Sequence, residues 1–203
     1  ISKTFVAMGI MQLVEEGKLS LDDKVQELVP SVEIKNPWKE SDPVRVKHLL
    51  EHTSGFDDMH FSEFYNTQHD PNISLEKALS INPKSRVVRW RPGTRYSYSN
   101  PGYAVAGFII EKITGQSYEE YLRRSILKPL DMMQSSFAYS DSVKQEMVTG
   151  YKGKYNPVEY QHIYLRPAGM LHSSPTDMAK FVQLLLNDGS LDGQKIIADS
   201  LLS

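Results

Sequence analysis

The most constraining feature of the sequence is a helical segment near its start that is apolar on almost every side. Between Thr4 and Glu16 the apolar side chains are Phe5, Val6, Ala7, Met8, Ile10, Met11, Leu13 and Val14. Such a helix has to be buried over most of its surface, so other elements must surround it. Gly17 follows, and glycine is the residue that most often ends a helix. The chain is therefore predicted to fold around a helix over residues 4–16.

The strongest helix start elsewhere in the chain is at Asn100. Its side chain suits an N-cap, Pro101 suits the first helical position, and Gly115 is expected to stop the helix. Ser117 and Glu120 then resemble a capping box for a further helix over residues 118–127.

Shorter elements complete the predicted architecture. Ser20 and Asp23 resemble a capping box that opens a short helix before Pro30, and residues 44–51 form another short segment. Ser174 is expected to cap a last helix that begins with Pro175. Strand signals are weak and are confined to residues 86–90 and 158–165. The expected fold class is α+β with helices in the majority.

Composition excludes several classes of protein. The 203 residues include 23 Lys and Arg against 25 Asp and Glu, and the net charge of -2 offers no field to gather nucleic acid. With no cysteine, disulfides, thiolate metal sites and cysteine nucleophiles are excluded. Apolar runs are far shorter than the ~20 residues that span a bilayer. No membrane span and no nucleic-acid partner are expected.

No cofactor or metal is expected either. No glycine-rich loop precedes a helix to hold phosphate, and the histidines lack the spacing of zinc ligands. Those histidines are His48, His52, His60, His69, His162 and His172. His52 and Ser54 are close in sequence, and a turn at Ser54 and Gly55 is expected to close the segment 44–51. The tyrosines Tyr151, Tyr155, Tyr160 and Tyr164 either line a substrate cleft or pack as an ordinary loop.

Lys3 is the first candidate for chemistry, because it lies at the start of the buried helix. In an S-x-x-K arrangement, a serine one turn before a lysine shares its helix face, and the amine can take the serine proton. That serine would stand one position before Ile1. Ser2 cannot replace it, since adjacent helical residues point ~100° apart. The alternative is that Lys3 only extends to water at a frayed chain end.

The second candidate is the triplet Tyr98, Ser99 and Asn100 at the mouth of the helix that follows. A phenol can pass protons if a neighbouring cation stabilises its anion, and an amide can both donate to and accept from a peptide-like substrate. Alternatively, Tyr98 only packs and Asn100 only caps the helix. The triplet alone does not decide between these interpretations.

Taken together, the motifs resemble the serine β-lactamase-related superfamily, in particular its class C β-lactamase, DD-peptidase and penicillin-binding-protein-like esterase branch. The resemblance runs through nearly the whole chain. Its main segments are Ser2-Lys3-Thr4-Phe5, the run 13–23, His52-Thr53-Ser54-Gly55, Tyr96-Ser97-Tyr98-Ser99-Asn100-Pro101-Gly102-Tyr103 and Pro167-Ala168-Gly169-Met170. It implies a serine hydrolase that forms an acyl-enzyme. Lys3 and Tyr98 would be catalytic, and Asn100 would bind the substrate and contact the lysine.

The resemblance also implies which parts of the family pattern are missing. The nucleophilic serine and a third motif, Lys-Thr-Gly or His-x-Gly on a strand, would lie off the two ends. Residues 1–203 are therefore expected to be a partial hydrolase domain, truncated at both termini. It would be mostly the helical region, with most of the antiparallel sheet missing, and it would be inactive by itself.

Two functions remain open at this stage. The first is hydrolysis of a β-lactam, a D-amino-acid peptide or a small ester. The second is a non-catalytic penicillin-binding-like protein that binds a peptidoglycan-type peptide or a partner protein. By resemblance, the protein is expected to be a monomer and to be periplasmic or extracellular.

Overall fold

Helices make up most of the regular structure in the computed structural model, which describes residues 1–66, 70–191 and 193–198. The α-helices are α1 (Ser2–Glu15), α2 (Val25–Leu28), α3 (Val46–Leu50), α4 (Phe61–Phe64), α5 (Leu75–Ser80), α6 (Asn100–Thr114), α7 (Tyr118–Leu122), α8 (Asp141–Glu146) and α9 (Pro175–Leu186). Two 3-10 helices, η1 (Pro83–Arg86) and η3 (Arg166–Ala168), and a π-helical turn, η2 (Arg123–Leu127), connect them.

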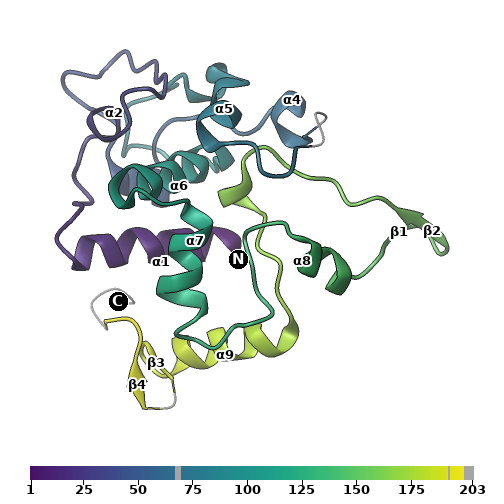
Figure 1. Ribbon diagram of the computed structural model, residues 1–203. Coiled ribbons are helices and arrows are strands. Elements are labelled where there is room, and N and C mark those ends of the chain that lie inside the picture. The colour runs from purple at the N-terminus through teal and green to yellow at the C-terminus, as the bar shows by residue number, and fades with distance from the viewer. Residues whose placement is uncertain (67–69, 192, 199–203) are drawn as a thin grey trace.

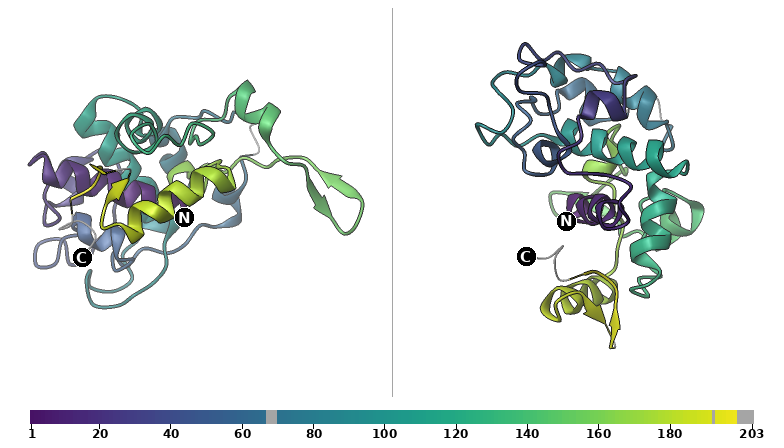
Figure 2. Two further views of the ribbon diagram at one scale, coloured as in Figure 1. Left: turned by 90° about the horizontal axis from the view of Figure 1, so that it is seen from below. Right: turned by 90° about the vertical axis from the view of Figure 1, so that its left-hand side faces the viewer.

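Helix α1 lies between α6 and α9, in the central position that its apolar sequence predicts (Figures 1 and 2). Phe5 is fully buried, and its ring centroid lies 4.5 Å from that of Phe181 in α9. The helix ends as predicted, because Gly17 adopts φ 67° and the next amide, of Lys18, donates to the carbonyl oxygen of Leu13 at 2.9 Å. Lys3 lies in the first turn of this buried helix.

The described strands are short and form two antiparallel pairs. β1 (Gly150–Lys152) pairs with β2 (Asn156–Val158) in a hairpin that projects from the body (Figure 1), and β3 (Ser190–Leu191) pairs with β4 (Gln194–Lys195). The strand predicted over 86–90 is wrong: Val87 makes one isolated bridge to Lys35, because η1 precedes it and a turn at Gly93 follows. The strand predicted over 158–165 overlaps β2 only at its first residue.

One predicted helix start and one predicted capping box are wrong, although α7 begins at Tyr118 after Ser117 as expected. Asp23 Oδ2 does accept from the amide of Ser20 at 2.8 Å, but this contact closes a turn, and the helix α2 begins later, at Val25. Ser117 caps α7 by accepting from the amide of Glu120 at 3.2 Å, whereas the Glu120 carboxylate turns outward to Arg123 and does not complete a capping box. α7 then ends at Leu122, and η2 continues it to Leu127.

The start of α6 differs from the sequence-based expectation by one residue. Ser99, not Asn100, is the N-cap, and its Oγ accepts from the amide of Gly102 at 3.2 Å. Asn100 is therefore the first helical residue, and its side-chain amide is not used for capping. Gly115 ends the helix in the left-handed region, as expected. In the described part of the chain, no helix has the length and apolar character needed to cross a bilayer.

Candidate active site

Lys3 lies at the centre of the candidate site. Its Nζ donates to Asn100 Oδ1 at 2.6 Å and to the carbonyl oxygen of Ala168 in η3 at 2.7 Å. The same ammonium lies over the ring of Tyr98, 4.9 Å from its centroid. The structure therefore brings together the three residues that the sequence singled out. The Lys3 ammonium does not simply extend into water at a frayed end, because it is hydrogen-bonded to α6 and η3.

Burial changes the protonation chemistry of this lysine. Desolvation lowers the pKa of Lys3 to about 8, and the nearby carboxylate of Asp58 opposes part of this effect. A lysine in water has a pKa of ~10.4, so it is almost never neutral at physiological pH. With the lowered pKa, an appreciable fraction of Lys3 is a neutral amine that can accept a proton.

Tyr98 occupies the segment just before α6 and stays partly open to solvent, with 45% of its surface exposed. The pKa of Tyr98 is raised from its ordinary value, mainly by burial and to a lesser extent by the negative charge of Asp58. The cation next to this phenol is Lys3, but it does not lower the pKa of Tyr98. The reason is geometric, because the ammonium contacts the ring and the two oxygen acceptors. In this structure Tyr98 is a neutral phenol, suited to donate or relay a proton.

Asp58 is a site residue that the sequence analysis missed. Its Oδ1 accepts from the side-chain amide of Asn100 at 2.7 Å and from the Asn100 backbone amide at 3.0 Å. The contact orients the amide of Asn100 so that Oδ1 points to Lys3. The signal in the sequence was a pair of acidic residues, Asp57 and Asp58, directly after the turn at Gly55. Only the tertiary fold shows that the second of them reaches the start of α6.

The comparisons with known proteins agree with this geometry. A sequence model of the beta-lactamase family matches residues 1–200. The chain belongs to the beta-lactamase family. Among curated relatives, Protein flp of Staphylococcus aureus (strain COL) is 29% identical over 204 residues, which cover 92% of this chain and 37% of that protein.

Solved structures confirm the predicted fold class. A penicillin-binding protein homologue from Pyrococcus abyssi, described as octameric, is 31% identical with a TM-score of 0.76 and covers 99% of this chain and 46% of that one. The D-amino acid amidase of Ochrobactrum anthropi is 25% identical with a TM-score of 0.77 and covers 99% of this chain and 56% of that one. The present chain thus spans roughly half or less of the length of these relatives.

The four tyrosines considered as a cleft lining do not form one surface in this beta-lactamase-family chain. Tyr164 is buried, whereas Tyr151 and Tyr155 are exposed on the β1–β2 hairpin. Tyr160 stacks on Tyr139 at 5.8 Å between ring centroids. The tyrosines are therefore dispersed over the core, the hairpin and a separate aromatic cluster.

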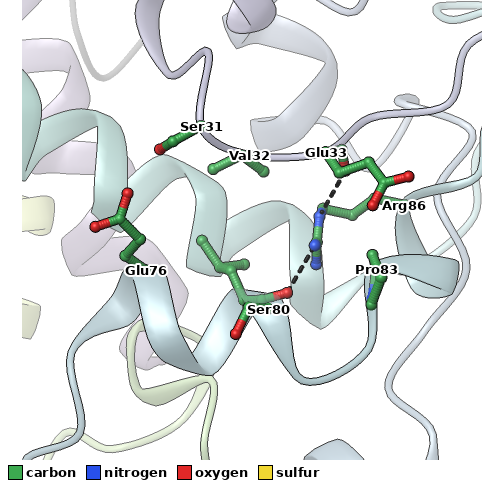
Figure 3. Close-up of a pocket in the computed structure, with 8 residues that line it drawn as sticks. Ser31, Val32, Glu33, Glu76, Ser80, Pro83 and Arg86 are labelled. Carbon is green, nitrogen blue, oxygen red and sulfur yellow. Dashed lines mark hydrogen bonds between the residues drawn. The ribbon is translucent and has the colours of Figure 1, made fainter.

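A cavity of about 190 Å³ lies elsewhere, between α5, η1 and residues 31–33. Arg86 lines it and donates to the carbonyl oxygens of Leu79 at 2.7 Å and Glu33 at 3.2 Å (Figure 3). Lys3, Tyr98 and Asn100 are not among its lining residues. Within the described ranges, no group of three or more His, Asp or Glu side chains is arranged to hold a metal ion. His69 lies outside these ranges.

Proposed function

We propose that the protein to which this chain belongs is a serine hydrolase that works through an acyl-enzyme. The observation that carries the proposal is the environment of Lys3, which is held by Asn100 Oδ1 and the carbonyl oxygen of Ala168 with a pKa lowered to about 8. A lysine with a purely structural role also needs oxygen acceptors, but it gains nothing from a pKa close to neutrality. A general base that works near neutral pH does need such a pKa, since the ideal catalytic pKa is close to the working pH.

The proposed nucleophile is a serine one position before Ile1. A residue three positions before Lys3 on α1 lies on the same helix face, one turn away. Ser2 is not suited to this role. It points in another direction, and its Oγ accepts from the backbone amide of Leu171 at 3.2 Å.

In the proposed first stage, neutral Lys3 removes the serine hydroxyl proton while the serine oxygen bonds to the substrate carbonyl carbon. The tetrahedral intermediate then collapses as the bond to the leaving group breaks, and the Lys3 ammonium returns this proton to the leaving group, either directly or through the Tyr98 hydroxyl, which gives up its own proton and takes the one from Lys3. In the second stage, water attacks the ester with Tyr98 and Lys3 handling its proton, and the serine is regenerated. In each stage the proton removed from the nucleophile is given back, to the leaving group in the first stage and to the serine oxygen in the second.

Asn100 has one hydrogen-bond donor left for the substrate. Its Oδ1 is taken by Lys3 and one amide hydrogen by Asp58, and a primary amide has two hydrogens. The remaining N–H is suited to a carbonyl oxygen of the bound acyl group. A β-lactam, a D-amino-acid peptide and a small ester all offer such an oxygen, so these three classes are the proposed substrates.

The test is covalent labelling of the full-length protein with a penicillin, a D-amino-acid amide and an activated ester, followed by intact-mass and peptide mass spectrometry. We expect one acyl group on the residue directly before Ile1, and its formation should slow about 10²- to 10⁴-fold in Lys3→Ala. The 203-residue chain alone should form no adduct. An adduct on Ser2 would contradict the proposed nucleophile, and tight binding without any adduct would favour the non-catalytic alternative.

Two further properties are proposed from the family resemblance. We propose that the protein is periplasmic or extracellular, where peptidoglycan-type substrates are found, and that it is a monomer. Cell fractionation and light scattering of the full-length protein test these statements. The octameric relative from Pyrococcus abyssi shows that another assembly occurs among similar proteins.

A further inference from the structure

His52 holds the backbone on both sides of Tyr98. It follows α3 with φ 58°, and this left-handed conformation turns the chain toward the start of α6. Its carbonyl oxygen accepts from the amide of Ser97 at 2.8 Å, and its ring Nδ1 accepts from the amide of Ser99 at 3.1 Å. The backbone amides on both sides of Tyr98 therefore donate to His52.

The ring of His52 also packs on the tyrosine itself. Its centroid lies 4.5 Å from that of Tyr98, 5.2 Å from Tyr103 and 5.9 Å from Tyr96. The imidazole therefore positions the Tyr98 ring relative to Lys3, and it also holds the backbone next to Tyr98. Since Ser99 is the N-cap of α6, the same contact fixes where Asn100 begins the helix.

We propose that His52 is a positioning residue which holds Tyr98 and Asn100 against Lys3 only while its Nδ1 is unprotonated, so that acid releases this segment. The physical reason is that Nδ1 has to be an acceptor for the Ser99 amide. A protonated ring would place two N–H donors against each other and would add a second cation beside Lys3. The effect on turnover rests on the proposed hydrolase function, but the hydrogen bond does not.

The groups around His52 set the direction of its pH response. Burial lowers the pKa of His52 below its usual 6.5, Lys3 lowers it further, and the carboxylate of Asp58 raises it. Burial raises the pKa of the facing phenols of Tyr98 and Tyr103, so neither contributes a negative charge at these pH values. The acceptor form of His52 is therefore present at neutral pH and is lost as the pH falls below the usual histidine range.

The hydrogen bond is tested first, by NMR on the full-length protein carrying ¹³C-carbonyl tyrosine, ¹⁵N serine and labelled histidine. With this labelling, an experiment that detects only a ¹⁵N amide bonded to a ¹³C carbonyl selects serines that directly follow a tyrosine. In this chain these are Ser97, Ser99 and Ser140. We expect the Ser99 amide to shift with the same midpoint as the His52 ring. A Ser99 amide that does not follow the ring would overturn the proposal, whatever the enzyme activity.

The role in the site is tested with two variants that both relieve the positive φ. In His52→Asn, Oδ1 occupies nearly the place of Nδ1 and accepts at every pH, and asparagine tolerates the left-handed conformation. His52→Gly has no acceptor. At neutral pH we expect kcat of His52→Gly to be about tenfold below that of His52→Asn, the loss of one hydrogen bond. As the pH falls through the His52 midpoint, the wild type should lose up to about tenfold in rate relative to His52→Asn.

A matched control is His48→Asn. His48 Nδ1 also accepts from a backbone amide, that of Arg45 at 3.1 Å, and burial also lowers the pKa of His48. This variant should leave the rate and its pH dependence unchanged. Equal rates and equal pH profiles for His52→Asn and His52→Gly would overturn the positioning role. If Lys3→Ala also has no effect, the proposed hydrolase function fails instead, and the Ser99 titration still decides the role of His52.

Discussion

A lysine ammonium usually lies in water, but Lys3 is enclosed by two oxygen acceptors and an aromatic ring. Each contact has a different effect. Burial favours the neutral amine, while the carboxylate of Asp58 favours the ammonium. Because the pKa of about 8 reflects both, changing a single residue should move the pH at which Lys3 becomes a base.

Asp58→Asn should shift the acid side of the acylation profile to lower pH. The asparagine Oδ1 can still accept from Asn100, but the charge that stabilises the Lys3 ammonium is gone. The pKa of Lys3 then falls, and the neutral amine is present at a lower pH. Initial rates of acylation from pH 5 to pH 10 are the measurement. Asp57→Asn is the control, since Asp57 pairs with Arg89 at 2.9 Å. A midpoint that stays fixed or rises in Asp58→Asn would show that Lys3 is not the titrating base.

Lys3 and Tyr98 should act as one unit. Lys3→Ala removes the base and Tyr98→Phe removes the hydroxyl while keeping the ring over Lys3. Each change alone should cost about 10²- to 10⁴-fold in turnover. The double variant should lose much less than the product of these losses, as happens when members of one catalytic set are removed together. Tyr96→Phe is the control, because 71% of Tyr96 is exposed. Fully multiplicative losses would mean separate roles.

At the scale of elements, helix lengths and helix ends were predictable where one local rule decides them. α1, α6 and α9 lie where apolar periodicity and the flanking Gly and Pro residues place them. The start of α6 was misplaced by one residue because Ser99 and Asn100 are both good caps. What decides between them is tertiary, since Asp58 and Lys3 bind the Asn100 side chain. Local sequence cannot show this competition.

The position of η3 depends on an ion pair that links it to α7. Arg166 Nη2 lies 2.7 Å from Glu119 Oε1, and both side chains are almost fully buried. Arg166 also donates to the carbonyl oxygen of Ile73. The ion pair therefore anchors the short helix whose Ala168 carbonyl receives Lys3. Neither residue carried a signal in the sequence, because a Glu in the first turn of a helix is common on protein surfaces.

Glu119→Gln should destabilise the protein far more than the same change one residue later. It leaves the buried Arg166 without a counter-charge, which typically costs about 3–5 kcal/mol. Glu120→Gln breaks a surface pair with Arg123, and little stability is lost there because solvent screens the two charges. Urea unfolding of both full-length variants measures the difference. Equal losses would show that the Arg166–Glu119 pair does not anchor η3.

At the scale of the whole molecule, the site is assembled from segments that are remote in sequence. Lys3 comes from α1, Asp58 from the turn after Gly55, Asn100 from α6 and the Ala168 carbonyl from η3. The family resemblance gave Lys3, Tyr98 and Asn100 because short motifs preserve them. Asp58 and Ala168 could not be assigned chemically, since one has no motif of its own and the other contributes only a backbone oxygen.

Close packing of α6 on η3 connects the core to this site. Gly107 in α6 faces Pro167, and a Cβ at that position would lie 2.5 Å from Pro167 Cγ and 2.9 Å from its Cβ. The proline ring is rigid and is bonded directly to Ala168. A methyl group at Gly107 can therefore be accommodated only if η3 moves away from α6, which carries the Ala168 carbonyl away from Lys3.

Gly107→Ala should lower both stability and turnover. Overpacking of this kind costs about 1–3 kcal/mol, partly offset by the ~1 kcal/mol that alanine gains over glycine in a helix. Gly9→Ala is a matched control, because its Cβ would also lie 2.5 Å from a neighbour, but that neighbour is the end of the flexible Leu122 side chain. Gly107→Ala should melt at lower temperature in calorimetry and should slow acylation, whereas Gly9→Ala should leave acylation unchanged. If both slow it equally, the loss is a general effect of core strain, and the packing of Pro167 on α6 does not position the Ala168 carbonyl.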